Sequence, residues 1–169
     1  MPRTKKEHII SKDEKQAADL QIKEMQKQID YDTRDFTIEL LITKFEKKDF
    51  FIPPYQRDFV WQPKNKTLFL ESVFLGLPIP FMFFADCDNG KQEVIDGAQR
   101  MQTLVEFYNN QLQLSGLKKL TKLNGFYFKD LSDTQQRKFL NKALRIIILE
   151  EDTPTAARQD HAGLDICQR

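Results

Sequence analysis

The sequence predicts an α+β fold in a single domain, because apolar residues follow two different periods along it. Residues 81–85 are an unbroken apolar run, and residues 144–149 are apolar and β-branched except for Arg145; both have the length of a buried strand. Residues 101–108 instead place apolar side chains at i, i+3, i+4 and i+7, which is one face of a helix. These side chains are Met101, Leu104, Val105 and Tyr108. At 169 residues, the chain is long enough to bury a sizeable core.

The composition is that of an ordinary globular domain, with 40% hydrophobic and 30% charged residues. Fourteen phenylalanines predict an aromatic-rich core. The formal net charge of +1 gives no overall drive towards nucleic acid or membrane, so any anion site has to be local. No window approaches the ~18 apolar residues of a membrane span, and the N-terminus lacks the apolar core of a signal peptide. We therefore expect a cytoplasmic protein with free thiols and no membrane partner.

Residues that could build a zinc site or a catalytic triad are few and scattered. Cys87 and Cys167 have no CxxC spacing, and the two histidines, His8 and His161, lie in the polar ends. GxxxxGK[ST], GxGxxG and HExxH motifs are all absent from the sequence. These absences argue against a P-loop NTPase and against a histidine-metal hydrolase or nuclease.

The first third of the chain predicts two helices and a short extended piece. Residues 1–32 form an N-terminal arm with an amphipathic helix over 12–30, whose narrow apolar stripe favours packing on the domain edge or against a partner. A dimer arm is the alternative. A second helix over 33–48 would be capped by Thr33. Residues 50–54 are extended and end at a proline pair.

The middle of the chain predicts a helix, a hairpin and a second helix in direct succession. Residues 64–76 have helical spacing and end at Gly76. The strand over 81–85 is followed by the turn signal Asp-Asn-Gly at 88–90 and by a returning strand over 92–95. The hairpin therefore delivers the chain directly into an Asp-Gly turn and the helix that follows it.

After that helix the sequence predicts irregular structure, one more helix and the strand over 144–149. Residues 111–122 are a basic connector, and 125–128 predict a short edge strand or lid. Ser132 and Gln135 form a capping box that opens a helix to about residue 142. Residues 152–169 follow an acidic stretch and have no sustained period, as in a polar tail or the truncated start of a further segment.

The candidate site begins in the stretch Asp-Gly-Ala-Gln-Arg at 96–100, which opens the helix after the hairpin. Backbone N–H groups and the helix dipole attract anions at such a position. Gly97 would let a phosphate approach the backbone, and Arg100 could hold phosphate oxygens with its planar fork. Asp96 could bind Mg²⁺ through water or orient a nucleophilic water. The alternative is structural: Asp96 caps the helix and pairs with Arg100 at i, i+4.

A second polar stretch is the proline-stiffened loop 53–61, which presents Gln56 and Arg57. We expect this loop to face the Asp-Gly turn and to complete the site. In the alternative, its aromatic residues dock on the core and Arg57 is solvated. The residue types and their spacing leave both readings open.

Three ordered motifs resemble the N-terminal domain of GmrSD-type proteins, which belongs to the ParB/sulfiredoxin-like superfamily. The motifs are Ile-Pro-Pro-Tyr-Gln-Arg-Asp-Phe-Val-Trp at 52–61, Glu-Ser-Val-Phe-Leu-Gly-Leu-Pro-Ile-Pro at 71–80 and Val-Ile-Asp-Gly-Ala-Gln-Arg-Met-Gln-Thr-Leu at 94–104. The resemblance covers about residues 33–151. It implies a compact ParB-like α+β domain with a small mixed sheet flanked by helices.

The resemblance also implies NTP binding, with Mg²⁺-dependent hydrolysis left open, in a defence protein that restricts modified phage DNA. Carried over by motif, the nucleotide-binding residues are Gln56, Arg57, Asp96, Gly97, Gln99 and Arg100. Of these, the catalytic candidates are Asp96, Gln99 and Arg100, and the Mg²⁺ ligand is Asp96. Ala98 departs from the family, which usually has a glutamine there, so binding is the stronger expectation and turnover the weaker one.

Relatives often continue into a histidine-metal nuclease domain, whereas this sequence ends at Arg169. We therefore assign no nuclease activity to the chain and expect such a domain or subunit as a partner. The alternative function is a non-catalytic DNA- or partner-binding domain. In that function Arg57 and Arg100 would contact DNA phosphates together with Lys118, Lys119 and Lys122, and the affinity would fall steeply with salt. A third, weaker possibility is assembly through the 12–30 helix.

Overall fold

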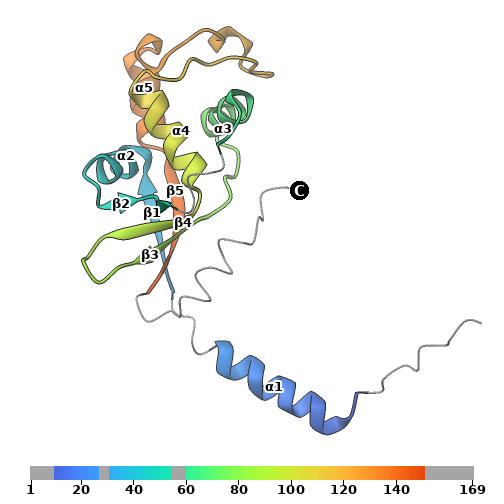
Figure 1. The fold of residues 1–169 in the computed structure, drawn as a ribbon. Coiled ribbons are helices and arrows are strands. Elements are labelled where there is room, and N and C mark those ends of the chain that lie inside the picture. Colours follow the sequence, from blue (N-terminus) through green and yellow to red (C-terminus); the bar gives the residue numbers. More distant parts are fainter. Residues whose placement is uncertain (1–9, 27–30, 55–59, 151–169) are drawn as a thin grey trace, which may run out of the picture.

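The computed structural model describes residues 10–26, 31–54 and 60–150 of the chain. Its five strands form one mixed sheet in the order β1-β5-β3-β4-β2, with helices beside it (Figure 1). The strands are β1 (Tyr31–Thr37), β2 (Phe50–Phe51), β3 (Met82–Asp86), β4 (Gln92–Asp96) and β5 (Ala143–Leu149). The helices are α1 (Lys12–Gln26), α2 (Ile38–Glu46), α3 (Pro63–Leu75), α4 (Ala98–Tyr108) and α5 (Asp133–Leu140). The predicted α+β class with a small mixed sheet is confirmed.

The centre of the sheet is β3, the strand predicted from the apolar run at 81–85. It pairs antiparallel with β4 and parallel with β5. Met82 and Phe84 are buried on the face that the helices cover, and Ala85 is buried on the other face. A strand buried on both faces has no polar alternation, which is why its sequence is continuously apolar. The predicted turn joins β3 to β4, with Gly90 at φ +74°.

The main hydrophobic core lies between the sheet and the helices α2 to α5, and aromatic rings fill much of it. The rings of Phe107 and Phe139 meet edge to face with their centroids 5.6 Å apart, and Phe107 meets Phe128 in the same way at 5.7 Å. A smaller cluster of Ala85, Ile95 and Leu149 lies on the opposite sheet face. The predicted aromatic-rich core is confirmed.

Several predicted elements have the expected positions. The helix α3 ends at Leu75, and Gly76 closes it in the left-handed conformation. The helix α5 begins after Ser132, whose Oγ accepts a hydrogen bond from the Gln135 nitrogen at 3.4 Å, and it ends at Leu140. None of the described helices is long and apolar enough to cross a membrane.

The helix predicted over 33–48 begins later than expected. Residues 31–37 form β1, which pairs antiparallel with β5 along its whole length. The helix α2 then begins at Ile38, and its N-cap is Thr37, not Thr33. Seven paired positions along β5 override the local helical spacing, since tertiary context outweighs propensity.

The edge strand predicted over 125–128 is also wrong, and the alternative of a lid stays a prediction. The segment turns instead: the Gly125 nitrogen donates to the Leu114 carbonyl at 2.7 Å, and the Leu114 nitrogen donates to the Phe126 carbonyl at 2.9 Å. Phe128 then begins the 3₁₀ turn η3 (Phe128–Asp130) and is buried. Its ring belongs to the core, which explains why an aromatic segment here is not a strand.

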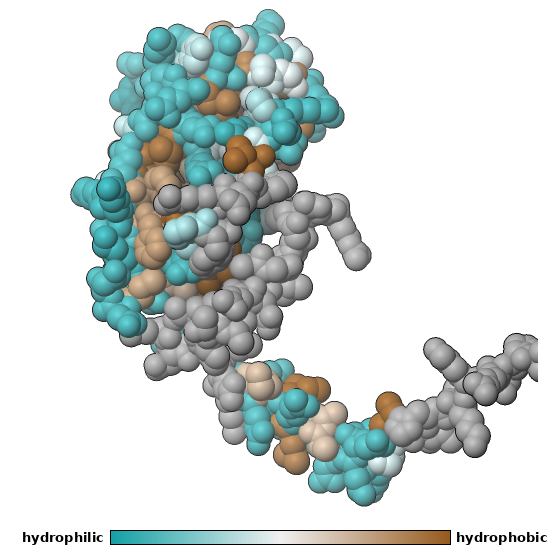
Figure 2. Space-filling view, in the orientation of Figure 1, coloured by the Kyte–Doolittle hydropathy of each residue, from teal (hydrophilic) through white to brown (hydrophobic). Residues whose placement is uncertain are grey.

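The N-terminal helix α1 is present, but it does not pack on the domain edge. None of its residues is buried, and Figure 1 draws it away from the sheet. Leu20, Ile22 and Met25 are each more than half exposed and give α1 its brown surface in Figure 2. Partner contact and the dimer arm stay predictions. Residues 1–9, 27–30 and 151–169 lie outside the described residues.

Candidate functional site

The Asp-Gly turn lies where β4 ends and α4 begins. Asp96 is the last residue of β4, and Gly97 is the N-cap of α4 with φ +100°. A Cβ on Gly97 would lie 2.5 Å from the Met82 Cγ on the neighbouring strand. Both the backbone conformation and the close approach of Met82 therefore require glycine. The space that the missing side chain leaves is filled by Met82.

Arg100 holds the carboxylate of Asp96 at the start of α4. Its Nη2 lies 2.8 Å from the Asp96 Oδ2, and its Nη1 donates to the Pro80 carbonyl. Arg100 is only 4% exposed, whereas the Asp96 side chain is 38% exposed. The i, i+4 pair of the structural alternative is thus present, but the helix cap is Gly97, not Asp96.

This geometry gives the two residues different chemical roles. The Arg100 guanidinium is buried and bound at two points, so it is not presented to a ligand in solution. Asp96 is accessible and its carboxylate is fixed in orientation by a charge-assisted hydrogen bond. Any contact of this pair with a ligand would therefore be made by Asp96.

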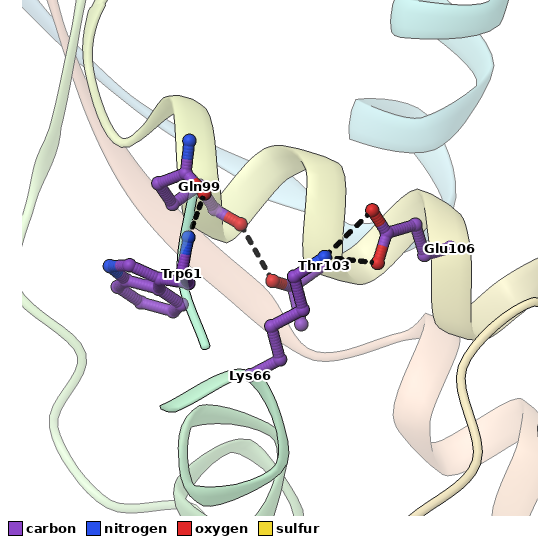
Figure 3. Close-up of polar contacts among 5 residues, drawn as sticks. All are labelled: Trp61, Lys66, Gln99, Thr103 and Glu106. Carbon is purple, nitrogen blue, oxygen red and sulfur yellow. Dashed lines mark hydrogen bonds and ion pairs between the residues drawn. The ribbon is translucent and has the colours of Figure 1, made fainter. Parts of the chain in front are cut away.

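Gln99 joins the first turn of α4 to the end of the proline loop (Figure 3). Its Oε1 accepts a hydrogen bond from the Trp61 backbone nitrogen at 2.8 Å. The Trp61 ring packs against Phe69 of α3 with 5.8 Å between centroids. The alternative predicts that aromatic residues of this loop dock on the core, and Trp61 does so. Gln56 and Arg57 lie outside the described residues, and their place in the site stays a prediction.

Two further polar contacts follow Gln99 along the face of α4 that meets α3. The Thr103 Oγ1 donates to the Gln99 carbonyl at 2.7 Å. The Lys66 Nζ on α3 lies 2.9 Å and 2.6 Å from the two carboxylate oxygens of Glu106 (Figure 3). Sequence reasoning missed this ion pair, because its partners are 40 positions apart. The Lys66–Glu106 ion pair holds the start of α3 against α4, and the Gln99 hydrogen bond holds residue 61 there.

A second missed residue is Glu71 of α3, a buried carboxylate. It accepts backbone hydrogen bonds from Lys119 at 2.7 Å and Leu120 at 2.8 Å, and a longer one from Lys118 at 3.3 Å. These bonds, above all that from Leu120, hold the pKa of the Glu71 carboxyl below its ordinary value. Glu71 thereby fixes the basic connector to α3.

Two surface depressions lie away from the Asp-Gly turn. One of about 330 Å³ lies between the 76–81 loop and the start of β5. The other, of about 560 Å³, lies beside the β3–β4 hairpin and is lined by Arg34, Lys44 and Asp86 among others. Neither includes residues 96–100. Among the described residues, no group of three or more His, Cys, Asp or Glu side chains could hold a metal ion.

Comparison with known proteins decides the family. The family model described as "GmrSD restriction endonuclease, N-terminal domain" matches residues 38–160, most of the chain. The chain belongs to this family. The match begins at the first residue of α2 and spans both stretches of the predicted site, which confirms the resemblance drawn from the three motifs. No curated protein and no solved structure matches the chain, and the ParB-like assignment of this GmrSD N-terminal domain stays a prediction.

Proposed function

We propose that this GmrSD N-terminal domain binds an NTP with Mg²⁺ at the start of α4. It would serve as the nucleotide-binding module of a modification-dependent restriction or phage-defence protein. The observation that supports the proposal most is the Asp96–Arg100 pair, which sets an accessible, oriented carboxylate beside the N-terminus of a helix. Helix N-termini attract phosphate groups, and carboxylates attract the cation that accompanies them.

The donor set suits Mg²⁺ better than a metal that needs a protein cage. Mg²⁺ is usually bound by one or two carboxylates, by waters and by the phosphates of its nucleotide. Asp96 would be the protein ligand, and the bound ion would neutralise phosphate charge. Without Mg²⁺, the carboxylate would repel a triphosphate. We therefore expect nucleotide affinity to depend on the cation.

The other residues of the motifs have supporting roles in this proposal. Arg100 is a positioning residue, because it is buried and acts through Asp96. Arg57 would bind phosphate oxygens, and Gln56 would orient the nucleotide. Gln99 would anchor the proline loop through Trp61. With Ala98 in place of the family's glutamine, we propose binding as the primary activity and hydrolysis as the weaker one.

Isothermal titration with ATP and GTP, with Mg²⁺ or with EDTA, tests the proposal. The variant is Asp96→Asn, and the matched control is Asp35→Asn, because Asp35 forms a similar exposed pair with Arg145 at 2.9 Å. We expect binding only with Mg²⁺, weakened by about tenfold or more in Asp96→Asn, which is at least ~1.4 kcal/mol, and unchanged in the control. Equal affinities of the two variants, or no binding by the wild type, would contradict it.

The alternative function, DNA binding by the same arginines, loses support from the burial of Arg100. A guanidinium that is 4% exposed and bound to Asp96 and Pro80 cannot also reach a DNA backbone in this arrangement. This argument does not apply to Lys118, Lys119 and Lys122 of the connector, since all three are exposed.

A further inference from the structure

Charge is distributed unevenly along this nearly neutral chain. Residues 111–145 contain eight lysines and arginines against two aspartates, a net charge of +6, whereas the whole chain carries +1. The basic residues are Lys118, Lys119, Lys122, Lys129, Arg137, Lys138, Lys142 and Arg145. A local excess of one sign creates an attractive field for polyanions even when the net charge is small.

Part of this segment is a fixed platform, which we name the basic cap and define as residues 111–131, between α4 and α5. It lies at the end of the molecule beyond α4 (Figure 1). The Leu117 nitrogen donates to the Asn124 Oδ1 at 2.9 Å, and Leu114 and Leu117 are buried in the main core. The cap is therefore held by packing as well as by its own turns.

Glu71 sets the direction of the cap's lysines. The backbone nitrogens of residues 118–120 turn inward to its buried carboxylate. Lys118, Lys119 and Lys122 are exposed. None of these three lysines forms an ion pair with a carboxylate in the part of the chain that the structure describes. Three exposed lysines that form no such ion pair thus project from a stiff backbone, and Lys119 also interacts electrostatically with the Glu71 carboxylate.

The surroundings of these lysines indicate which polyanion they suit. The large hydrophobic side chains that are exposed in the described chain all lie outside residues 111–145, and Figure 2 shows a mostly hydrophilic surface over this end. Amphipathic segments that bind a membrane surface bury apolar groups in it as well as presenting basic ones, and protein interfaces are poor in lysine. A lysine cluster without exposed apolar neighbours is instead typical of contacts to a phosphate backbone.

We infer that the basic cap binds the phosphate backbone of duplex DNA through Lys118, Lys119 and Lys122. The choice of duplex DNA rests on the proposed restriction function, whereas the phosphate chemistry rests on the cap itself. The cap follows the C-terminal end of α4 and Asp96 precedes its N-terminal end, so an 11-residue helix of about 16 Å separates them. Nucleotide and DNA would therefore occupy different surfaces.

Fluorescence anisotropy with a labelled DNA duplex, over a range of salt concentrations and without nucleotide, tests this inference. The variant is K118Q/K119Q/K122Q, and the matched control is K12Q/K15Q/K23Q, which removes three exposed lysines from α1. We expect the slope of log affinity against log salt to shrink by about 2–3 in the cap variant, because each phosphate contact contributes about 0.9. The control should keep the wild-type slope.

Three results would overturn the inference: no duplex binding by the wild type at low salt, equal losses in both variants, or tighter binding to single-stranded RNA or anionic vesicles. The lysines are exposed, so all variants should keep the wild-type circular dichroism and unfolding midpoint. Asp96→Asn should bind the duplex normally, and the cap variant should bind Mg²⁺–NTP normally. A failure of nucleotide binding would therefore leave the duplex result unaffected.

Discussion

The amide oxygen of Gln99 lies 2.8 Å from the backbone nitrogen of Trp61 and joins the first turn of α4 to a loop 38 positions earlier. Trp61 is also packed against Phe69, so its position is fixed from two sides. This contact links the two sequence stretches that the family motifs pair. It also gives Gln99 a positioning role, because its side-chain oxygen already has a protein donor.

The first prediction concerns Gln99. Gln99→Leu removes the acceptor and should lower the free energy of unfolding by about 0.5–1.5 kcal/mol. Gln99→Glu keeps an acceptor oxygen and should cost less. Trp61 is the only tryptophan, so its emission reports directly on this contact during urea unfolding. Wild-type stability and emission in Gln99→Leu would show that the hydrogen bond does not hold the loop.

The second prediction separates steric and conformational demands at Gly97. Gly97→Ala adds a Cβ at 2.5 Å from Met82 to a residue at φ +100°, and it should destabilise the domain by about 2 kcal/mol or more. Gly90→Ala is the control, since Gly90 also has positive φ but nothing lies within 4 Å of its Cβ position. Chemical denaturation of both should show the larger loss in Gly97→Ala. Equal losses of stability in the two variants would mean that the Met82 side chain moves aside at no cost in free energy.

The third prediction is a pH dependence set by Glu71. Its pKa is lower in the folded chain than the ordinary value of 4.5, so the unfolded chain binds the proton more readily. The stabilisation is thus complete above pH 4.5 and is lost as the pH falls through the folded-state pKa. Glu71→Gln should be less stable than the wild type at neutral pH, and the difference should shrink on acidification.

Unfolding midpoints of the wild type and Glu71→Gln across this pH range provide the measurement. The pKa values of Asp32 and Asp35 are also lowered, by hydrogen bonds from Arg34 and Arg145. These groups titrate in both proteins and cancel in the comparison. A gap between the two proteins that stays constant with pH would argue against a charged Glu71 as the anchor of the cap.

Structural features that depend on a local pattern of residues could be predicted from the sequence. The period of α4, the left-handed stop at Gly76 and the capping of α5 by Ser132 each depend on residues within one or two turns. The Asp96–Arg100 pair likewise follows from i, i+4 spacing. Such features are governed by helix geometry, which needs no knowledge of the rest of the chain.

Features that depend on distant partners could not be predicted in this way. Local spacing predicts a helix where residues 33–37 belong to β1, because the partner strand β5 lies about 110 positions later, as the Asp35–Arg145 contact shows. Glu71 finds its donors 47 to 49 positions away. Gly97 was explained by a phosphate although Met82 fills the space beside it. In each case, a contact between residues distant in the sequence determines the local structure or the role of the residue.

The most direct test of nucleotide binding at the start of α4 is an NMR titration of protein labelled with ¹⁵N-glycine. The chain has six glycines, and Gly97 reports on the Asp-Gly turn, whereas Gly76 and Gly90 each line one of the two surface depressions. On addition of Mg²⁺–NTP, the largest shift is expected at the Gly97 amide, and Asp96→Asn should raise the nucleotide concentration that this shift requires by about tenfold or more. A shift at Gly76 or Gly90 with Gly97 unmoved would contradict the account.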